Sequence, residues 1–313
     1  MMALLWMRFV LFIILVAGSN AVWLSAQGLP GQPSHSFFDD VQIGIEPVAE
    51  GIFMLTGEGG NIGVSAGDDG VFLIDDQFAP LTDKIIKAIA TISSEPIKFL
   101  FNTHWHTDHT GGNENLGETG ALIVAHDNVR VRMSTEQFQA HFNRTVPPSP
   151  DVALPIVTFS EAVTFHVNDE EIYAFQVPPA HTDGDSVIHF RKTNVVHTGD
   201  LFTNGKYPFI DLSSGGTLNG MIEATNILLE IVDPKTKIIP GHGPVADREV
   251  LKNYRHMLLT VRDRVKEMIS SGKTADEVIQ AKPTKEFDSK YKVGFLTPEA
   301  FTRLAYDSLK KDF

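Results

Sequence analysis

Cysteine is absent from this sequence of 313 residues. The chain therefore has no disulfide framework, no cysteine nucleophile, no thiolate ligand for a metal and no cysteine for a lipid anchor. Basic residues are also few, because 26 lysines and arginines stand against 39 acidic residues and leave a formal net charge of −13. Surfaces that bind nucleic acid normally carry the opposite sign, so we expect no nucleic-acid partner.

The remaining composition is that of an ordinary globular protein, with 42% hydrophobic and 21% charged residues. This balance excludes a disordered polymer, a collagen and a polytopic membrane protein. Histidine is frequent by comparison, with 12 residues. The positions of these histidines carry most of the functional prediction.

Residues 1–26 have the features of a secretory signal peptide. The apolar run from Phe9 to Ala17 has the length of an h-region, and small residues up to Ala26 offer a cleavage site. This interpretation predicts a periplasmic or secreted protein, whereas a retained segment would act as a signal anchor in the membrane. Residues 27–40 then form a predicted linker, rich in glycine and proline at its start, that leads into one domain over residues 41–313.

The remainder of the chain alternates strand and helix patterns. Short apolar runs predict strands at 52–55, 61–65, 71–74 and 98–101 in a first half, and at 156–159, 162–166, 172–177, 187–190, 194–197 and 238–239 in a second. Apolar residues at helical spacing predict helices over 81–92, near 218–231, over 251–268 and from Pro298, with Thr297 as N-cap. A proline-rich stretch at 146–150 separates the halves without a flexible linker. The pattern therefore predicts one layered α/β domain.

The most informative segment follows the predicted strand that ends at Phe101. It reads Asn-Thr-His-Trp-His-Thr-Asp-His and supplies four potential metal ligands, His104, His106, Asp108 and His109. In an extended turn alternate side chains project the same way, so His104 and His106 could hold one metal while Asp108 and His109 reach a second. Active sites of α/β sheets lie at such carboxyl ends of strands. Imidazole and carboxylate ligands without thiolate suit zinc, iron, manganese or nickel, with zinc the usual choice for hydrolysis.

This segment resembles the His-x-His-x-Asp-His signature of the metallo-β-lactamase superfamily. The later motifs of that family follow in order across the chain: His181 in Pro-Ala-His-Thr-Asp-Gly-Asp, Asp200 after Val-Val-His-Thr-Gly, and His242 in Pro-Gly-His-Gly-Pro. Upstream, Leu-Ile-Asp ends at Asp75, which matches an aspartate that supports the first histidine cluster from outside the ligand set. The order of these motifs after a complete first one makes the resemblance specific.

The resemblance implies a four-layered αβ/βα sandwich, in which two mixed β-sheets lie face to face between helices. It also implies two metal ions, with the ligands on loops along one edge of the sandwich. The first metal would be held by His104, His106 and His181. The second would be held by Asp108, His109 and His242, and Asp200 would bridge the two.

A site of this kind implies an exported zinc-dependent hydrolase that acts on a small molecule. Two zinc ions, for which iron or manganese could substitute, would share a hydroxide that attacks a carbonyl, while the catalytic Asp108 orients it and moves its proton. Ester, thioester, lactone and β-lactam bonds all fit this chemistry. β-Lactamases that use a cysteine ligand have it where this chain has Asp200, so β-lactamase activity does not follow from the resemblance.

Two other functions remain open. One is a mononuclear iron-dependent oxidoreductase, similar to the persulfide dioxygenases of the same fold, although the intact Asp108, His109 and His242 argue against it. The other is a binding protein that has the fold of an enzyme but has lost catalysis. This function is disfavoured because none of the metal-ligating residues of the family motifs is missing. Elemental analysis separates zinc from iron.

Several residues near these motifs have more than one interpretation. Lys206 could pair with a substrate carboxylate or be a solvated loop lysine. Trp105 is expected to pack or to shield the site, and the tip at Gly57–Gly60 could be a mobile flap or an ordinary hairpin turn. The other histidines show no ligand spacing and are predicted to be surface or core residues: His35, His126, His141, His166, His189, His197 and His256.

Overall fold

The computed structural model describes residues 37–292 and 294–312. The predicted signal segment and residues 27–36 of the predicted linker lie outside this range, so both stay predictions. Residues Asp40–Phe313 form one compact unit. None of the helices in the described part of the chain combines the length and the apolar character that crossing a membrane requires.

The first sheet is mixed and has seven strands. They are ordered β1 (Gly44–Ala49), β2 (Ile52–Thr56), β3 (Ile62–Gly67), β4 (Gly70–Ile74), β5 (Ile97–Asn102), β6 (Leu122–His126) and β9 (Val157–Phe159). The first four strands pair antiparallel, and the sheet continues parallel from β4 to β9. Helices connect its parallel strands, as such crossovers require: α1 (Thr82–Ile89), α2 (Thr107–Thr110), α3 (Asn113–Glu118) and α4 (Asp127–Met133).

The second sheet has five strands and is also mixed. They are β10 (Ala162–Val167), β11 (Glu170–Gln176), β12 (Ser186–Phe190), β13 (Val195–His197) and β14 (Lys237–Ile239). Neighbours pair antiparallel except β13 and β14, which are parallel and are connected through α5 (Leu218–Ile231). The chain ends in a helical region with α6 (Arg248–Ser270), α7 (Ala275–Gln280), α8 (Asp288–Tyr291) and α9 (Pro298–Leu309).

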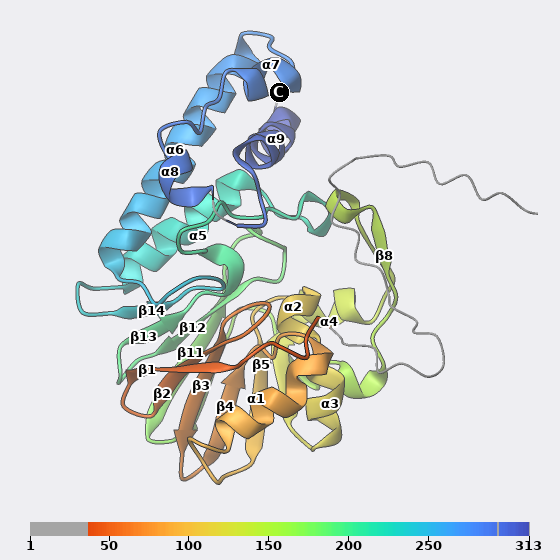
Figure 1. Cartoon of the computed structure of the whole chain (residues 1–313), viewed down its shortest axis with the longest axis vertical. Coiled ribbons are helices and arrows are strands. Elements are labelled where there is room, and N and C mark those ends of the chain that lie inside the picture. Colours follow the sequence, from red (N-terminus) through yellow and green to blue (C-terminus); the bar gives the residue numbers. More distant parts are fainter. Residues whose placement is uncertain (1–36, 293, 313) are drawn as a thin grey trace, which may run out of the picture. The chain divides into compact units, whose positions relative to one another are not determined.

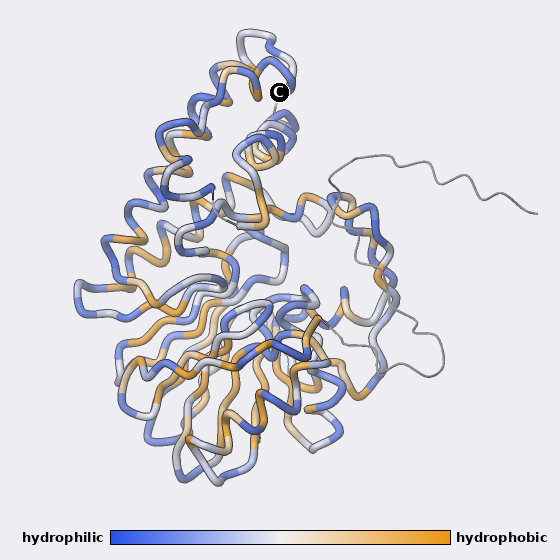
Figure 2. Tube along the Cα trace, viewed as in Figure 1, coloured by the Kyte–Doolittle hydropathy of each residue, from blue (hydrophilic) through white to orange (hydrophobic). Residues whose placement is uncertain are grey.

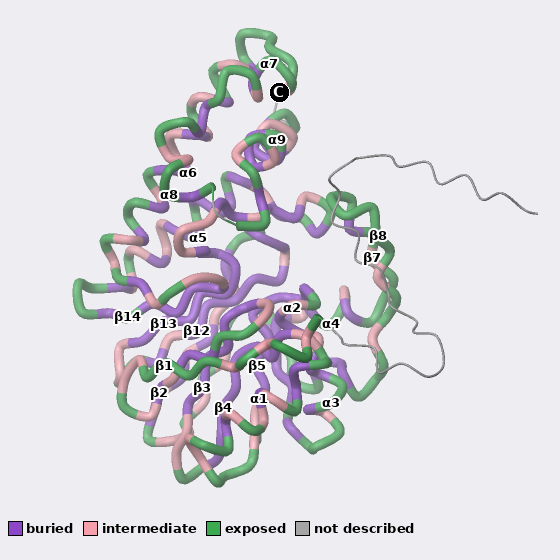
Figure 3. The backbone as a smooth tube through the Cα atoms, in the orientation of Figure 1, coloured by how far each residue is buried: buried purple, intermediate pink, exposed green. Residues whose placement is uncertain are grey.

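Apolar side chains from both sheets meet in one core, which makes the two sheets the inner layers of a sandwich (Figure 1). Phe72 and Phe101 of the first sheet and Phe165 of the second form part of this core, with Phe72 and Phe165 ring centroids 4.9 Å apart. A second core joins the outer face of β12–β14 to α5, α6 and α9. Figures 2 and 3 show hydrophobic and buried residues concentrated in the strands. The predicted sandwich of two mixed sheets flanked by helices is confirmed.

The structure assigns one predicted strand to a different sheet from the one that chain order suggests. The run at 156–159 follows the proline-rich stretch and was expected to open the second half. It forms β9, which pairs parallel with β6 and so completes the first sheet. Two further strands of this sheet are not predicted by the sequence pattern: β1, an edge strand with an irregular register at Pro47, and β6. Proline is tolerated at such edges because the missing N–H costs no central ladder bond.

Candidate metal centre

All seven predicted ligands lie just beyond the carboxyl end of a strand. The segment after β5 passes through His104 and His106 into α2, which carries Asp108 and His109. His181 follows β11. Asp200 lies in a short 3-10 helix, Gly199–Leu201, directly after β13, and His242 follows β14. Because these strands end at the same edge of the sandwich, segments far apart in the sequence meet there.

The structure brings the ligand atoms of these residues together in three overlapping groups. Within each group the candidate ligand atoms all lie within 4.8 Å of one another. The groups are His104 with His106 and His181, Asp108 with His109 and His242, and His104 with His109 and Asp200. The first two groups have the same members as the two ligand sets that the resemblance implies. The third group shares His104 with the first and His109 with the second, and adds Asp200.

Asp200 reaches both of the first two groups with its two carboxylate oxygens. Its Oδ1 lies 3.3 Å from both His109 Nε2 and His242 Nε2, and its Oδ2 lies 3.6 Å from His181 Nε2. Asp108 Oδ2 completes the second group at 3.3 Å from His242 Nε2. Asp200 thus lies between the two histidine groups, and its bridging of two metals stays a prediction.

Hydrogen bonds on the outer side of the rings determine which nitrogen of His104 and His109 faces inward. Asp75 Oδ2 accepts the hydroxyl proton of Thr103 at 2.8 Å, so Thr103 Oγ1 is left to accept from His104 Nδ1 at 3.0 Å. The same Asp75 oxygen accepts from His109 Nδ1 at 2.7 Å. With a proton on Nδ1, each ring directs its Nε2 into the centre. Asp75 therefore orients both rings, directly at His109 and through Thr103 at His104, and its role beside a metal site stays a prediction.

The rings of His106 and His181 are held in the same manner by other partners. His106 Nε2 donates to Asp211 Oδ2 at 2.9 Å, and His181 Nδ1 donates to the carbonyl oxygen of Phe209 at 2.8 Å. The remaining nitrogens, His106 Nδ1 and His181 Nε2, face each other at 2.9 Å. Two nitrogen lone pairs at this distance repel each other unless a cation or a proton lies next to both.

Several buried polar atoms of the centre have no hydrogen-bond partner. They are His104 Nε2, His109 Nε2 and Asp200 Oδ1. Buried polar groups are nearly always satisfied, and the unsatisfied ones commonly mark an ion or a catalytic role. Together with the facing nitrogens of His106 and His181, these atoms form a donor set that fits divalent cations of the zinc type.

Electrostatics of the cluster favour positive charge at its centre. Burial opposes ionisation of Asp200, but the charges of His242 and then His109 hold the pKa of its carboxyl well below the ordinary value. Burial would lower the pKa of His242, yet Asp200 and Asp108 raise this pKa to about 9. Burial and the neighbouring histidines hold the pKa of His104 well below its usual range. The ionised carboxylates also raise the pKa of His109 well above its ordinary value. The centre thus attracts positive charge, which protons on His242 and His109 supply or which a metal ion would supply in their place.

Asp211 is a functional candidate that the sequence analysis missed. Besides accepting from His106, its carboxylate accepts from the backbone N–H groups of Ser213 at 3.0 Å and Ser214 at 3.2 Å, and from Ser214 Oγ at 2.6 Å. Trp105 Nε1 donates in turn to Ser214 Oγ at 3.1 Å. Asp211 is far from every histidine in the sequence, and only the turn that follows it, Leu-Ser-Ser-Gly, marks it as a capping residue.

The substitution Asp211→Asn is expected to weaken metal binding by about 10- to 100-fold, the usual effect of losing such an outer partner. The amide keeps the size of the side chain but removes the charge that orients His106. The measurement is a competition titration of zinc against a chromophoric chelator. Asp233→Asn is the matched control, because Asp233 also caps a turn but is exposed and contacts none of the candidate ligands. Equal zinc affinity of the Asp211 variant and the control would contradict the positioning role.

The glycine-rich tip at Gly57–Gly60 is held against the centre. Gly60 N donates to Asp108 O at 3.0 Å, and Gln77 Nε2 donates to Gly60 O at 2.7 Å. A Cβ added at Gly60 would lie 2.2 Å from His109 Cε1, so only glycine fits there. These contacts favour the hairpin turn over the mobile flap.

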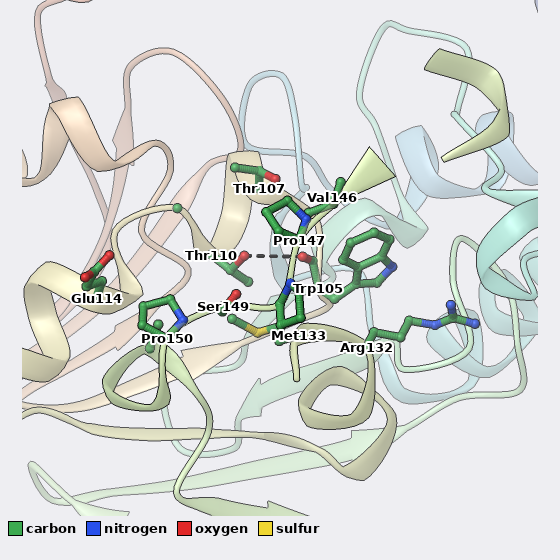
Figure 4. A pocket seen from close by; sticks show the side chains of 13 residues that line it. Trp105, Thr107, Thr110, Glu114, Arg132, Met133, Val146, Pro147, Ser149 and Pro150 are labelled. Atoms are coloured by element: carbon green, nitrogen blue, oxygen red, sulfur yellow. Dashed lines mark hydrogen bonds between the residues drawn. The ribbon is translucent and has the colours of Figure 1, made fainter. Parts of the chain in front are cut away.

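Trp105 is buried, with 4% of its surface exposed, and it packs as the sequence analysis expected. Its ring lines a cavity of about 250 Å³ together with the proline-rich stretch at 146–150. Figure 4 shows this ring beside Pro147 and Met133. The proline-rich stretch therefore packs beside Trp105, which lies between His104 and His106 in the sequence.

Lys206 lies on the loop that follows Asp200, next to the segment that carries His242. Thr203, on the same loop, forms a β-bridge with His242. In the described part of the chain the Lys206 ammonium forms no ion pair, and its aliphatic stem runs beside Gly294. The substrate-binding role of Lys206 stays a prediction.

Two further histidines lie near the centre although they show no ligand spacing. His197 is buried, accepts from Gly199 N at 3.2 Å and faces the carbonyl oxygen of Asn61. Burial lowers its pKa to about 4, so it is a neutral core histidine. His141 is exposed and its ring lies 5.1 Å from the ring of Phe209, measured between centroids. It belongs to an aromatic cluster beside His106 and His181.

This protein is a sandwich of two sheets with a histidine–aspartate cluster at the strand ends. That combination is typical of a class of metallohydrolases. The family model described as the metallo-beta-lactamase superfamily matches residues 55–264. The chain therefore belongs to this superfamily.

Curated relatives include hydroxyacylglutathione hydrolases of two bacteria. The one from Nitrosococcus oceani is 26% identical over 164 residues, which are 52% of this chain and 55% of that protein. The one from Pelagibacter ubique is 26% identical over 148 residues, 47% of this chain and 52% of that protein. The chain thus spans about half the length of the curated relatives it matches.

Similar solved structures include metallo-beta-lactamases. One from Pontibacter korlensis has a TM-score of 0.56 and 20% identity, covering 70% of this chain and 99% of that one. FIM-1 from Pseudomonas aeruginosa, solved in its mono-zinc form, has a TM-score of 0.55 and 21% identity, covering 70% of this chain and 96% of that one. At this identity the likeness establishes the fold.

Proposed function

We propose that this protein is a zinc-dependent hydrolase of a small carboxylic acid derivative: an ester, a thioester, a lactone or a β-lactam. The observation that carries the proposal is the Asp200 carboxylate, whose two oxygens reach two histidine groups at 3.3 and 3.6 Å. The names of the relatives support the reaction class, since hydroxyacylglutathione is a thioester and a β-lactam is a cyclic amide.

The residues fit two metal ions. His104, His106 and His181 would hold one, Asp108, His109 and His242 the other, and Asp200 would serve both. Metals bound there would polarise the substrate carbonyl and lower the pKa of water toward neutrality, so that a nucleophile can form without a strong protein base. The outer hydrogen bonds that the rings donate to Asp75, Asp211 and Phe209 hold the rings in place before any ligand arrives.

Asp108 faces the accessible side of the centre. Its side chain is 30% exposed and that of His242 is 21% exposed, whereas His104, His109 and His181 are buried. A substrate therefore approaches over Asp108 and His242. Asp108 Oδ2, 3.3 Å from His242 Nε2, is the carboxylate oxygen placed to take a proton from water and to return it to the leaving group.

The proposal is tested with the purified protein before and after treatment with a chelator. We expect turnover on at least one member of a panel (nitrocefin, a homoserine lactone, an aryl ester and a glutathione thioester), loss of turnover after chelation and recovery with zinc. Elemental analysis of the same sample identifies the metal. Absence of metal-dependent hydrolysis across the panel, or iron together with oxygen consumption on a persulfide, would overturn the proposal.

A further inference from the structure

Among the exposed apolar side chains of the described residues, two form a stacked pair. Phe142 is 40% and Phe295 is 62% exposed, and their rings lie 5.5 Å apart at 29°. Both rings also contact Phe209, at 5.5 and 6.0 Å between centroids. Exposed apolar groups that cluster in this way commonly mark a binding surface, whereas single ones do not.

Three separate segments build this cluster, which we name the aromatic wall and define as His141, Phe142, Phe209 and Phe295. The first two come from the connection between β7 (Gln137–Gln139) and β8 (Arg144–Val146). Phe209 comes from the loop after Asp200, and Phe295 comes from the segment before α9. His141 lies 5.1 Å from Phe209 and 5.7 Å from Phe295.

The aromatic wall is continuous with the candidate metal centre. The ring of Phe209 lies 5.9 Å from the rings of both His106 and His181, and its carbonyl oxygen accepts from His181 Nδ1. The wall therefore begins at the ligands of the first group. Asp108, which serves the leaving group in the proposed function, belongs to the second group.

The surroundings of the wall are largely apolar. A cavity of about 350 Å³ shares His141 and Phe209 with it and is also lined by Ile210, Leu212 and Leu304, by Asp211, and by Arg303 and Asp307, which pair with each other. Burial lowers the pKa of His141, against the charge of Asp211, and so favours the uncharged form of this ring. The guanidinium of Arg144 lies 5.8 Å from the Phe142 ring and covers part of it.

We propose that the aromatic wall binds an uncharged apolar substituent, an aromatic ring or an aliphatic chain, on the acyl side of the scissile bond. The inference rests on the proposed function. When the carbonyl lies at the centre and the leaving group lies toward Asp108, the acyl substituent points toward His106 and His181 and continues onto Phe209. Stacking and apolar burial there select substrates with large apolar acyl groups over those with small acyl groups.

The kinetic test compares acetyl, hexanoyl and 4-phenylbutyryl substrates with the same leaving group, using the zinc-loaded full chain. In the wild type we expect kcat/KM to rise about two- to fourfold per methylene, because a fully buried methylene contributes at most ~0.8 kcal/mol. In Phe142→Ala and Phe295→Ala we expect the ratio of the 4-phenylbutyryl to the acetyl rate constant to fall at least about tenfold.

Phe138→Ala is the matched control. Phe138 lies on the same hairpin, is 55% exposed and forms none of the ring contacts of the wall. We expect this variant to keep the wild-type preference. A kcat/KM that does not depend on the acyl group, or an equal loss of preference in Phe138→Ala and Phe142→Ala, would overturn the inference.

A binding measurement separates failure of this inference from failure of the proposed function. Calorimetric titration of the zinc-loaded protein with acetate and with 4-phenylbutyrate needs no turnover. We expect 4-phenylbutyrate to bind at least about tenfold more tightly, and Phe295→Ala to remove most of the difference. If no substrate is hydrolysed but this difference is found, the proposed function fails and the wall is supported; equal affinities would contradict the wall alone.

Discussion

Replacing Asp200 or His106 by alanine is expected to lower metal content and hydrolytic turnover by at least about 100-fold. Each loss should exceed the 10- to 100-fold effect of removing an outer partner, because these side chains are themselves candidate ligands. Asp200 offers one oxygen to each histidine group, at 3.3 and 3.6 Å. His106 offers the nitrogen that faces His181 at 2.9 Å.

Metal per chain is measured by elemental analysis after dialysis, and turnover is measured on the same samples. His166→Ala is the matched control, because His166 lies exposed on β10 and belongs to no candidate ligand group. The control should keep the metal content and turnover of the wild type. Full metal content and full turnover in both the Asp200 and the His106 variants would refute the assignment of the centre.

The second large effect is expected from Gly241→Ala, which places one methyl group inside the centre. A Cβ added at Gly241 would lie 2.0 Å from Asp200 Oδ1 and 2.6 Å from the carbonyl carbon of Gly199. Relief requires a shift of Asp200 or of the backbone, and forced shifts of this kind cost about 1–3 kcal/mol. We expect loss of turnover and of zinc affinity together with a moderate decrease in the free energy of unfolding. The free energy of unfolding is measured by urea denaturation.

Gly120→Ala is the matched control. It distinguishes the effect of a steric clash at Gly241 from the effect of replacing any glycine by alanine. Gly120 has a φ of +92°, and a Cβ there would meet nothing within 4 Å. This variant should cost about 1–2 kcal/mol through its left-handed backbone and leave zinc binding unchanged. A Gly241 variant that binds zinc and turns over as the Gly120 variant does would contradict the close packing of Gly241 against Asp200.

The candidate ligands could be predicted from the sequence because each one lies in a short motif next to an apolar strand. His104, His106, Asp108 and His109 occur within six residues, and a strand end fixes where such a segment must lie. Asp211 could not be predicted, because its partner His106 is 105 residues away and nothing local relates the two. Outer partners of this kind depend on how loops meet, which is decided by the packing of the whole domain.

The fold class could also be predicted, whereas the membership of strands in the sheets could not. Periodicity identifies an apolar run such as Val157–Phe159 as a strand but does not name its partner, and β9 pairs with β6 across the β7–β8 hairpin. The aromatic wall has the same origin. Phe142, Phe209 and Phe295 are unremarkable in the sequence and become one surface only when three connections converge beside the centre.

Stepwise addition of zinc to chelator-treated wild-type protein, with turnover and bound metal recorded at each step, tests the central claim most directly. The two groups joined by Asp200 predict that two zinc ions bind per chain and that turnover appears only as they bind. Turnover that persists without metal, or a protein that binds no zinc at all, would contradict the account.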